Sequence, residues 1–231
     1  MSVVDERFDL EVLRGAIRYQ RWLLDAFGPA LSGRVLEVGP GIGNFTRWLA
    51  ERADTVVAVE PDPTMSRDVA ALGRGNVQVL EQTIEDLAGS DESFDCVFLC
   101  NVLEHIDDDA AALKVAHSLL APGGHACVVV PAHEWLLGSL DRRYGHLRRY
   151  RRDEVQGLLQ ASGFVDVSAA YFNPIGALGW YAVSRAAKRP HLTRRSVLLS
   201  ERLAVPVGQA LARLGPPPFG QSVVATGRKA V

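Results

Sequence analysis

The sequence has almost no excess charge of either sign. Its 231 residues include 25 Lys and Arg against 27 Asp and Glu, a net charge of −2. A protein that binds nucleic acid through its phosphates usually carries a large basic surface. The balanced charge does not indicate a large basic surface, so no nucleic-acid partner is expected. Hydrophobic residues reach 48%, which excludes a disordered chain.

Cysteine is scarce, and long apolar runs are missing. Cys96, Cys100 and Cys127 lie in apolar runs without metal-ligand spacing, which is typical of inert core thiols in a reducing compartment. No metal site is therefore expected. The apolar stretch PIGALGWYAV (174–183) is far short of the ~20 residues of a spanning helix. The N-terminal MSVVDERFDLEV lacks the apolar region of a signal peptide, so a cytoplasmic protein is predicted.

Short β-branched runs alternate with amphipathic stretches along the first 130 residues. The runs are RVLEV (34–38), TVVAVE (55–60), VQVL (77–80), DCVFLC (95–100) and HACVVV (125–130). The amphipathic stretches are NFTRWLAERA (44–53), DPTMSRDVAAL (62–72) and DAAALKVAHSLL (109–120). This alternation predicts an α/β fold, a doubly wound, mostly parallel sheet with helices on both faces. LAPGG (120–124) is predicted to end a helix and turn tightly into the fifth strand.

The pattern changes after Pro131. RRDEVQGLLQASGF (151–164) predicts a helix, and FVDVSAAYF (164–172) and SVVATGRK (222–229) predict two more strands. The residues between these strands are too many for a plain connector. We therefore expect a single domain over 1–231, with an N-terminal helical cap (1–33) and a helical insertion (172–221) that forms a cap, an interface or a lid.

A glycine-rich turn follows the first strand. VLEVGPGIGNF (35–45) places Gly39, Gly41 and Gly43 where the backbone must turn sharply and approach a ligand, and Glu37 stands just before them. Glu60 ends the second strand, where a carboxylate can accept both hydroxyls of a ribose. The spacing G-x-G-x-G differs from the G-x-G-x-x-G of dinucleotide enzymes, which disfavours an NAD-dependent oxidoreductase.

From about residue 19 to 170 the sequence resembles the class I S-adenosylmethionine-dependent methyltransferases. The resemblance rests on VLEVGPGIGNFT (35–46), the acidic end of AVEPDP (58–63), FDCVFLCNVLEHIDD (94–108) and LLAPGGHACVVVP (119–131). It implies a Rossmann-like sheet of seven strands, the last antiparallel, and S-adenosyl-L-methionine as the cofactor.

The resemblance also implies which positions bind this cofactor. Glu37 suits the ammonium of the amino-acid portion, the three glycines line the amino-acid and ribose portions, and Glu60 holds the ribose. The remaining positions are Pro61 and Asp62 on one side of the adenine, Thr83 and Ile84 on its other side, Asn101 and Val102 under the methionine portion, and Tyr19 and Trp22 as a cover. Core packing explains Trp22 equally well.

The arginine-rich stretch DRRYGHLRRYRR (141–152) follows the fifth strand, at the edge where open α/β sheets bind ligands. It matches D-x-x-x-G-H-x-R-R-Y, a pattern similar to that of a bacterial small-molecule subgroup of the family. This interpretation makes His146 and His133 the catalytic candidates. The substrate-binding candidates are Asp141, Arg148, Arg149 and Tyr150 in the stretch, and Phe172, Asn173 and Trp180 beyond it. Arginine suits an anionic acceptor, although Tyr150 can simply pack, and His105 is expected to support the site.

The predicted function is methyl transfer to a small-molecule or conjugate-terminal acceptor, with a carboxylate or hydroxyl oxygen favoured. N- or C-methylation stays open, as does a catalytically silent cofactor-binding partner of a related enzyme. NVLE after the fourth strand replaces the D/N-P-P-Y motif of enzymes that methylate amino groups of nucleic acids. The insertion has no helix with a dense basic face, so association with a membrane surface is not expected.

Overall fold

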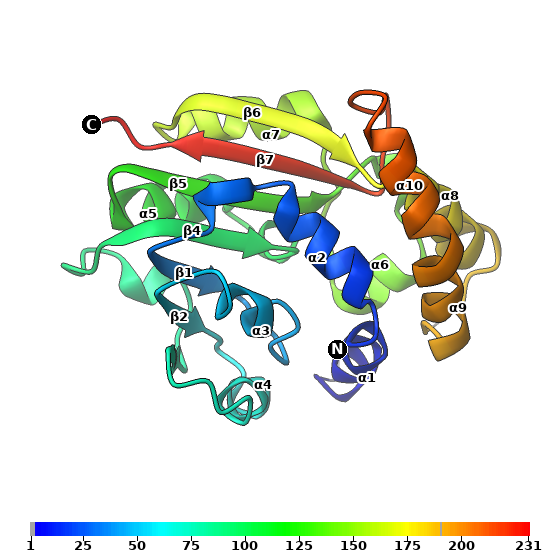
Figure 1. Cartoon of the computed structure of the whole chain (residues 1–231), viewed down its shortest axis with the longest axis horizontal. Helices are drawn as coiled ribbons and strands as arrows, with labels where there is room; N and C mark the ends of the chain where they lie inside the picture. The colour runs from blue at the N-terminus through cyan, green and yellow to red at the C-terminus, as the bar shows by residue number, and fades with distance from the viewer. Residues whose placement is uncertain (1–2, 190) are drawn as a thin grey trace.

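A computed structural model of the chain describes residues 3–189 and 191–231, which fold around one seven-stranded sheet (Figure 1). The strand order is β3-β2-β1-β4-β5-β7-β6. Neighbouring strands from β3 to β5 run parallel, whereas β7 is antiparallel to both β5 and β6. The predicted α/β class and the antiparallel last strand are confirmed.

The central strands are buried on both faces, because helices cover the sheet on either side (Figure 1). Since β1, β4 and β5 are parallel, their carboxyl ends meet at one edge of the sheet. The strands are β1 (Arg34–Val38), β2 (Thr55–Val59), β3 (Val77–Leu80), β4 (Phe94–Cys100), β5 (Leu120–Pro131), β6 (Val165–Phe172) and β7 (Ser222–Arg228).

The LAPGG segment differs from its prediction. The helix α5 (Asp109–Leu119) ends as expected, but the chain enters β5 at once instead of turning. Leu120 lies opposite Phe94 and His125 opposite Cys96, so the extra residues bulge from the ladder. The C-terminal Lys229 holds this bulge, because its Nζ donates to Leu120 O at 2.6 Å and its backbone pairs with both glycines of the segment.

Helices with clear start signals form where the sequence predicts them. Asp62 accepts hydrogen bonds from Thr64 N and Met65 N at the start of α4, and Asp108 caps α5. The helix predicted at 44–53 shortens to a single turn, α3. The other helices before β6 are α1 (Val3–Leu13), α2 (Ile17–Asp25), α3 (Thr46–Leu49), α4 (Pro63–Ala70), α6 (Ser139–Tyr144) and α7 (Arg152–Ala161).

Residues 173–189 and 191–221, between β6 and β7, form a helical insertion beside α1 and α2 (Figure 1). Its Glu201 carboxylate accepts hydrogen bonds from Arg18 N at 2.7 Å and Tyr19 N at 3.0 Å, and so caps α2. The insertion is thereby tied to the N-terminal helices. Its helices are α8 (Pro174–Trp180), the π-helix η5 (Tyr181–Ala186), α9 (Arg194–Leu199), the π-helix η6 (Ser200–Ala204) and α10 (Val205–Ala212).

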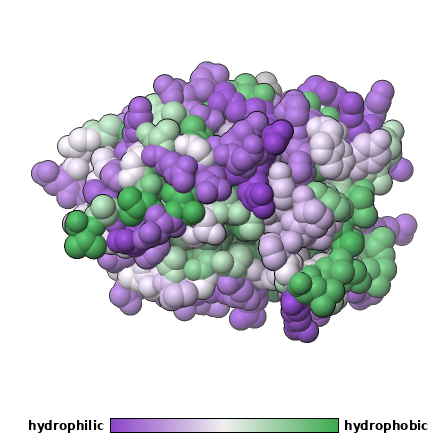
Figure 2. Space-filling view, turned by 90° about the horizontal axis from the view of Figure 1, so that it is seen from above, coloured by the Kyte–Doolittle hydropathy of each residue, from purple (hydrophilic) through white to green (hydrophobic). Residues whose placement is uncertain are grey.

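The insertion exposes an apolar surface. Figure 2 shows apolar side chains gathered at the end of the molecule where α8 to α10 lie in Figure 1. The exposed large apolar residues of this region are Leu178, Tyr181, Leu198, Leu199, Leu203, Val207, Leu211 and Leu214. Within the described part of the chain, no helix is both long enough and apolar enough to cross a bilayer.

Candidate active site

The glycine-rich turn leaves β1 in a left-handed backbone conformation. Gly39, Gly41 and Gly43 have φ values of 62°, 57° and 79°, which favour glycine strongly. A Cβ at Gly39 would lie 2.8 Å from Val102 Cγ2, and one at Gly43 would lie 2.7 Å from a leucine methyl of the loop after α4. The turn therefore needs glycine at both positions, because Val102 and Leu72 pack directly against it. This turn and the residues around it, at the end of β1, are called the cradle below.

Glu37 lies at the inner wall of this cradle with its charge unbalanced. Its side chain is buried, and its Oε2 has no hydrogen-bond partner among the residues that the structure describes. Burial, together with a smaller contribution from the charge of Glu60, raises the pKa of Glu37 to about 8 despite the opposing effect of the Thr46 hydroxyl. A cation beside Glu37 would satisfy this carboxylate, and an ammonium group is such a cation.

Glu60 is fixed at the end of β2 by backbone donors. Its carboxylate accepts hydrogen bonds from Gly41 N at 2.9 Å and from Asp62 N at 3.1 Å. These contacts join the end of β2 to the glycine turn. The Asp62 carboxylate is already used as the cap of α4, and Pro61 is exposed. Of these three candidates, Glu60 therefore lies deepest against the cradle.

The ends of β3 and β4 complete this part of the edge. Val102 contacts Gly39, and Asn101 has a left-handed φ of 55°, which directs the chain over the end of β4. Thr83 binds Asp86 through both its backbone N–H and its hydroxyl, whereas Ile84 is buried in the core. The turn, Glu60 and Val102 are thus brought together by direct contacts.

Tyr19 and Trp22 lie on α2 and pack against the end of β6. The ring of Phe172 is 4.2 Å from that of Trp22 and 6.1 Å from that of Tyr19, and Trp22 also meets Gly208 of α10. Phe172 is buried in this aromatic cluster and does not line an open wall. Asn173 is buried too, because it caps α8 and binds Gln221. These four residues join the insertion to the sheet.

Asp141 is the hub of the arginine-rich stretch. Its buried carboxylate binds His146 Nδ1 at 2.9 Å and Arg149 Nε at 2.8 Å. It also accepts hydrogen bonds from Gly138 N at 2.8 Å and Trp180 Nε1 at 3.2 Å. Burial alone would raise the pKa of Asp141, but the His146 hydrogen bond and the Arg149 charge lower it. This arrangement does not support direct substrate binding by Asp141 or Trp180, because both are already engaged by the protein.

The two candidate anchoring arginines are also engaged. Arg149 is buried and donates to Asp141 and to Ala132 O at 2.9 Å. Arg148 binds Asp109 at 3.0 Å, and the Tyr150 hydroxyl donates to the same carboxylate at 2.8 Å. Arg148, Arg149 and Tyr150 thus fasten the stretch to the fold, and Arg149 also lines the cavity described below.

His146 instead faces two residues that follow β4. The short 3₁₀ turn η3 (Leu103–His105) carries Glu104 and His105, and the His105 ring stands edge-on to His146 at 4.8 Å. Glu104 Oε1 lies 3.9 Å from His146 Nε2. Burial raises the pKa of Glu104 to about 8. The sequence analysis missed Glu104, although its place directly after a central strand was a usable signal.

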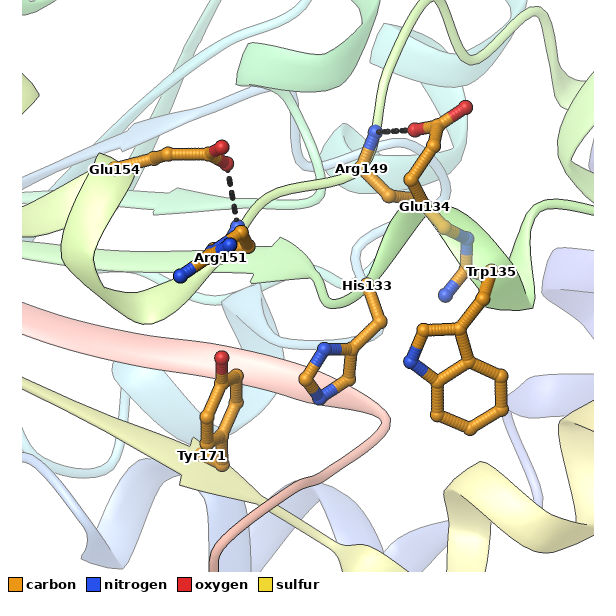
Figure 3. Close-up of a pocket in the computed structure, with 7 residues that line it drawn as sticks. All are labelled: His133, Glu134, Trp135, Arg149, Arg151, Glu154 and Tyr171. Carbon is orange, nitrogen blue, oxygen red and sulfur yellow. Dashed lines mark hydrogen bonds between the residues drawn. The ribbon is translucent and has the colours of Figure 1, made fainter.

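His133 lines the main cavity of this region, beside the end of β5. It has a φ of 61° and stacks on Tyr171 at 4.5 Å and on Trp135 at 5.5 Å (Figure 3). His133 Nε2 has no hydrogen-bond partner among the described residues. Burial and the charges of Arg149 and Arg151 lower the pKa of His133. The cavity has a volume of about 510 Å³ and is lined by His133, Glu134, Trp135, Arg149, Arg151, Glu154 and Tyr171.

Comparison with known sequences agrees with this edge geometry. A family model described as a methyltransferase domain matches residues 13–169. A ubiquinone biosynthesis O-methyltransferase of Methylobacterium nodulans is 30% identical over 183 residues, which cover 68% of this chain and 72% of that protein. Several other curated relatives match over only about half of their own length.

Solved structures share the fold. An S-adenosylmethionine-dependent methyltransferase from Mesorhizobium loti matches with a TM-score of 0.62 at 18% identity, covering 89% of this chain and 95% of that chain. A complex of DhpI with SAH matches with a TM-score of 0.57 at 21% identity, covering 98% of this chain and 97% of that chain. At these identities the likeness concerns the fold alone.

Proposed function

The chain belongs to the class I S-adenosylmethionine-dependent methyltransferases, and on that premise we propose that it methylates an oxygen atom of a small molecule held beside His133. The observation that carries the proposal is the cavity after β5. Its volume of about 510 Å³ suits a small molecule, since ligand pockets usually measure roughly 300–1,000 Å³. The relative that is named an O-methyltransferase supports oxygen as the acceptor atom.

The cofactor supplies a methyl group on a positively charged sulfur, which is already activated for transfer. Glu37 would bind its ammonium, because this buried carboxylate otherwise lacks a cation. Glu60 would bind the ribose hydroxyls, and the glycine turn would leave room for the amino-acid portion. The protein's main task is then to align the acceptor oxygen with the methyl group.

The cavity residues give the acceptor its chemistry. Trp135 and Tyr171 flank His133 and would pack on a flat acceptor (Figure 3). Arg151 lines the cavity and pairs with Asp153 at 3.1 Å in an exposed ion pair, so it would have to exchange this partner to bind an anionic group. Because its pKa is lowered, His133 is neutral near pH 7 and would take the proton of an acceptor hydroxyl. Its Nε2 is buried without a partner among the described residues, so the acceptor would have to displace a stacked ring to reach this nitrogen. A carboxylate acceptor would need no base.

The test is turnover with a panel of phenols and carboxylic acids, measured as release of the demethylated cofactor. His133→Ala should lower turnover of a hydroxyl acceptor about 10²-fold or more, and should leave cofactor affinity unchanged because the glycine turn lies elsewhere. His125→Ala is the matched control, since His125 lies within β5, several residues before His133, and does not line the cavity. Wild-type kinetics of His133→Ala on the best acceptor would overturn the assignment of this cavity.

A further inference from the structure

Three side chains with metal-ligand chemistry meet beside the carboxyl end of β4. One ligand atom from each of Glu104, His105 and His146 lies within 4.8 Å of the others. The Glu104 side chain is 0% exposed, and neither of its oxygens has a hydrogen-bond partner among the described residues. A buried carboxylate without a partner is costly, so this cluster requires either a bound proton or a bound cation.

The orientation of His146 favours a cation. Its Nδ1 is held by Asp141 at 2.9 Å, which leaves Nε2 facing Glu104 at 3.9 Å. Asp141 is in turn fixed by Arg149 and by Gly138 N. Histidines that bind metals usually have their second ring nitrogen anchored by a carboxylate in this way. The fold therefore presents a preoriented imidazole to an unsatisfied carboxylate.

We propose that Glu104, His105 and His146 bind a divalent transition-metal ion. Two imidazole nitrogens and one carboxylate form the ligand set of many catalytic zinc sites, which keep a further position open. Magnesium is disfavoured, because it prefers oxygen ligands and retains several waters. The ion would occupy the gap between the three ligand atoms, which would close on it to the usual ligand distances of ~2.0–2.2 Å.

The position of the cluster indicates what the ion would do. Glu104 follows Val102, which contacts Gly39 in the cofactor cradle, so the ion would lie beside the cofactor site. Its three ligands do not line the cavity beside His133, so an acceptor would have to reach beyond that cavity to place its oxygen on the open position, where the ion would lower the pKa of the hydroxyl. The hydroxyl proton passes to His133 or to water, the oxygen forms its bond to the methyl carbon, and the carbon–sulfur bond breaks with its electron pair left on sulfur. This role rests on the proposed O-methylation, whereas metal binding does not.

Metal binding is tested first, without turnover. The full chain is stripped with a chelator, dialysed and titrated with Zn²⁺ by calorimetry, and with Co²⁺ while its visible absorption is recorded. One equivalent should bind, and a tenfold excess of Mg²⁺ should not compete. Glu104→Gln and His146→Ala should each weaken Zn²⁺ binding at least about tenfold. His125→Ala, a histidine outside the cluster, should bind as the wild type does.

The titrations distinguish a metal site from a buried, protonated carboxyl group. Glu104→Gln keeps the shape of the side chain and removes a buried charge, so it should fold, which a melting curve checks. Absence of saturable Zn²⁺ binding to the wild type, or an unchanged wild-type affinity in both cluster variants, overturns the proposal and leaves Glu104 as a protonated acid. Metal binding without methylation of any hydroxyl acceptor would instead count against O-methylation alone. Cofactor affinity should be unchanged in all three variants.

Discussion

Replacing Glu37 with glutamine should stabilise the cofactor-free protein while weakening its affinity for the cofactor. Glu37 is buried, and its pKa is raised from 4.5 to about 8. Between about pH 4.5 and pH 8, Glu37 keeps its proton in the folded chain but has lost it in the unfolded chain. Folding therefore becomes less favourable as the pH rises from about 4.5 to about 8. Glutamine has no charge to bury, so the variant avoids this penalty.

The gain in stability expected for Glu37→Gln follows from the pKa shift of Glu37. Each pKa unit corresponds to about 1.4 kcal/mol, so the penalty at pH 7 is roughly 3 kcal/mol. For a chain of this size about 1 kcal/mol changes the melting temperature by roughly 2–4 °C. Glu37→Gln should therefore melt about 6–12 °C higher than the wild type at pH 7, and at nearly the same temperature at pH 4.5. Loss of a charge-assisted contact of about 1.5–3 kcal/mol should weaken cofactor binding at least tenfold.

The assay is thermal unfolding across pH 4.5–8, with and without the demethylated cofactor. Glu85→Gln is the control, because Glu85 is exposed and its loss should leave the melting temperature unchanged at every pH. A constant difference between Glu37→Gln and the wild type over this range would refute the burial argument. Unchanged cofactor affinity would refute the assignment of Glu37 to the ammonium.

Three further substitutions probe the same edge. Glu60→Ala should weaken cofactor binding at least about tenfold in calorimetry, because a charge-assisted ribose contact contributes roughly 1.5–3 kcal/mol. Gly39→Ala should lower stability by about 1–3 kcal/mol, since its φ is 62°, whereas Gly157→Ala in open helical space should raise it by ~0.5–1 kcal/mol. Arg149→Ala should cost roughly 3–5 kcal/mol in chemical denaturation by leaving a buried carboxylate unpaired, whereas exposed Arg151→Ala should cost little. Equal costs at the two arginines, or at the two glycines, would contradict these structural assignments.

The fold could be predicted because its signals are local. Buried strands read as β-branched runs, and the glycine turn between β1 and α3 requires the left-handed conformations that the structure shows. The bulge at LAPGG could not be predicted, since Lys229, more than one hundred residues away, provides its hydrogen bonds.

The arginine-rich stretch shows why the site was harder to predict than the fold. Arg148 and Arg149 are adjacent, yet the first turns to Asp109 on α5 and the second to Asp141 on α6. Neighbouring residues of an extended segment point to opposite sides, so composition reveals the charge but not its direction. The contact between His146 and Glu104 depends on how the stretch folds back on the end of β4, which the sequence pattern does not specify.

The buried carboxylates of this protein differ in whether the protein itself supplies their hydrogen-bond donors. Asp141 is enclosed by donors, and its lowered pKa marks a charge that the protein itself has neutralised. Glu37 and Glu104 are equally buried but have oxygens without partners, and their pKa values are raised. A fold stabilised only by its own contacts has no reason to retain such groups, because an apolar side chain would be better there. Both lie near the cofactor edge, so a cation from outside the chain is the simplest physical account of each: the cofactor's ammonium at Glu37, and a metal ion at Glu104.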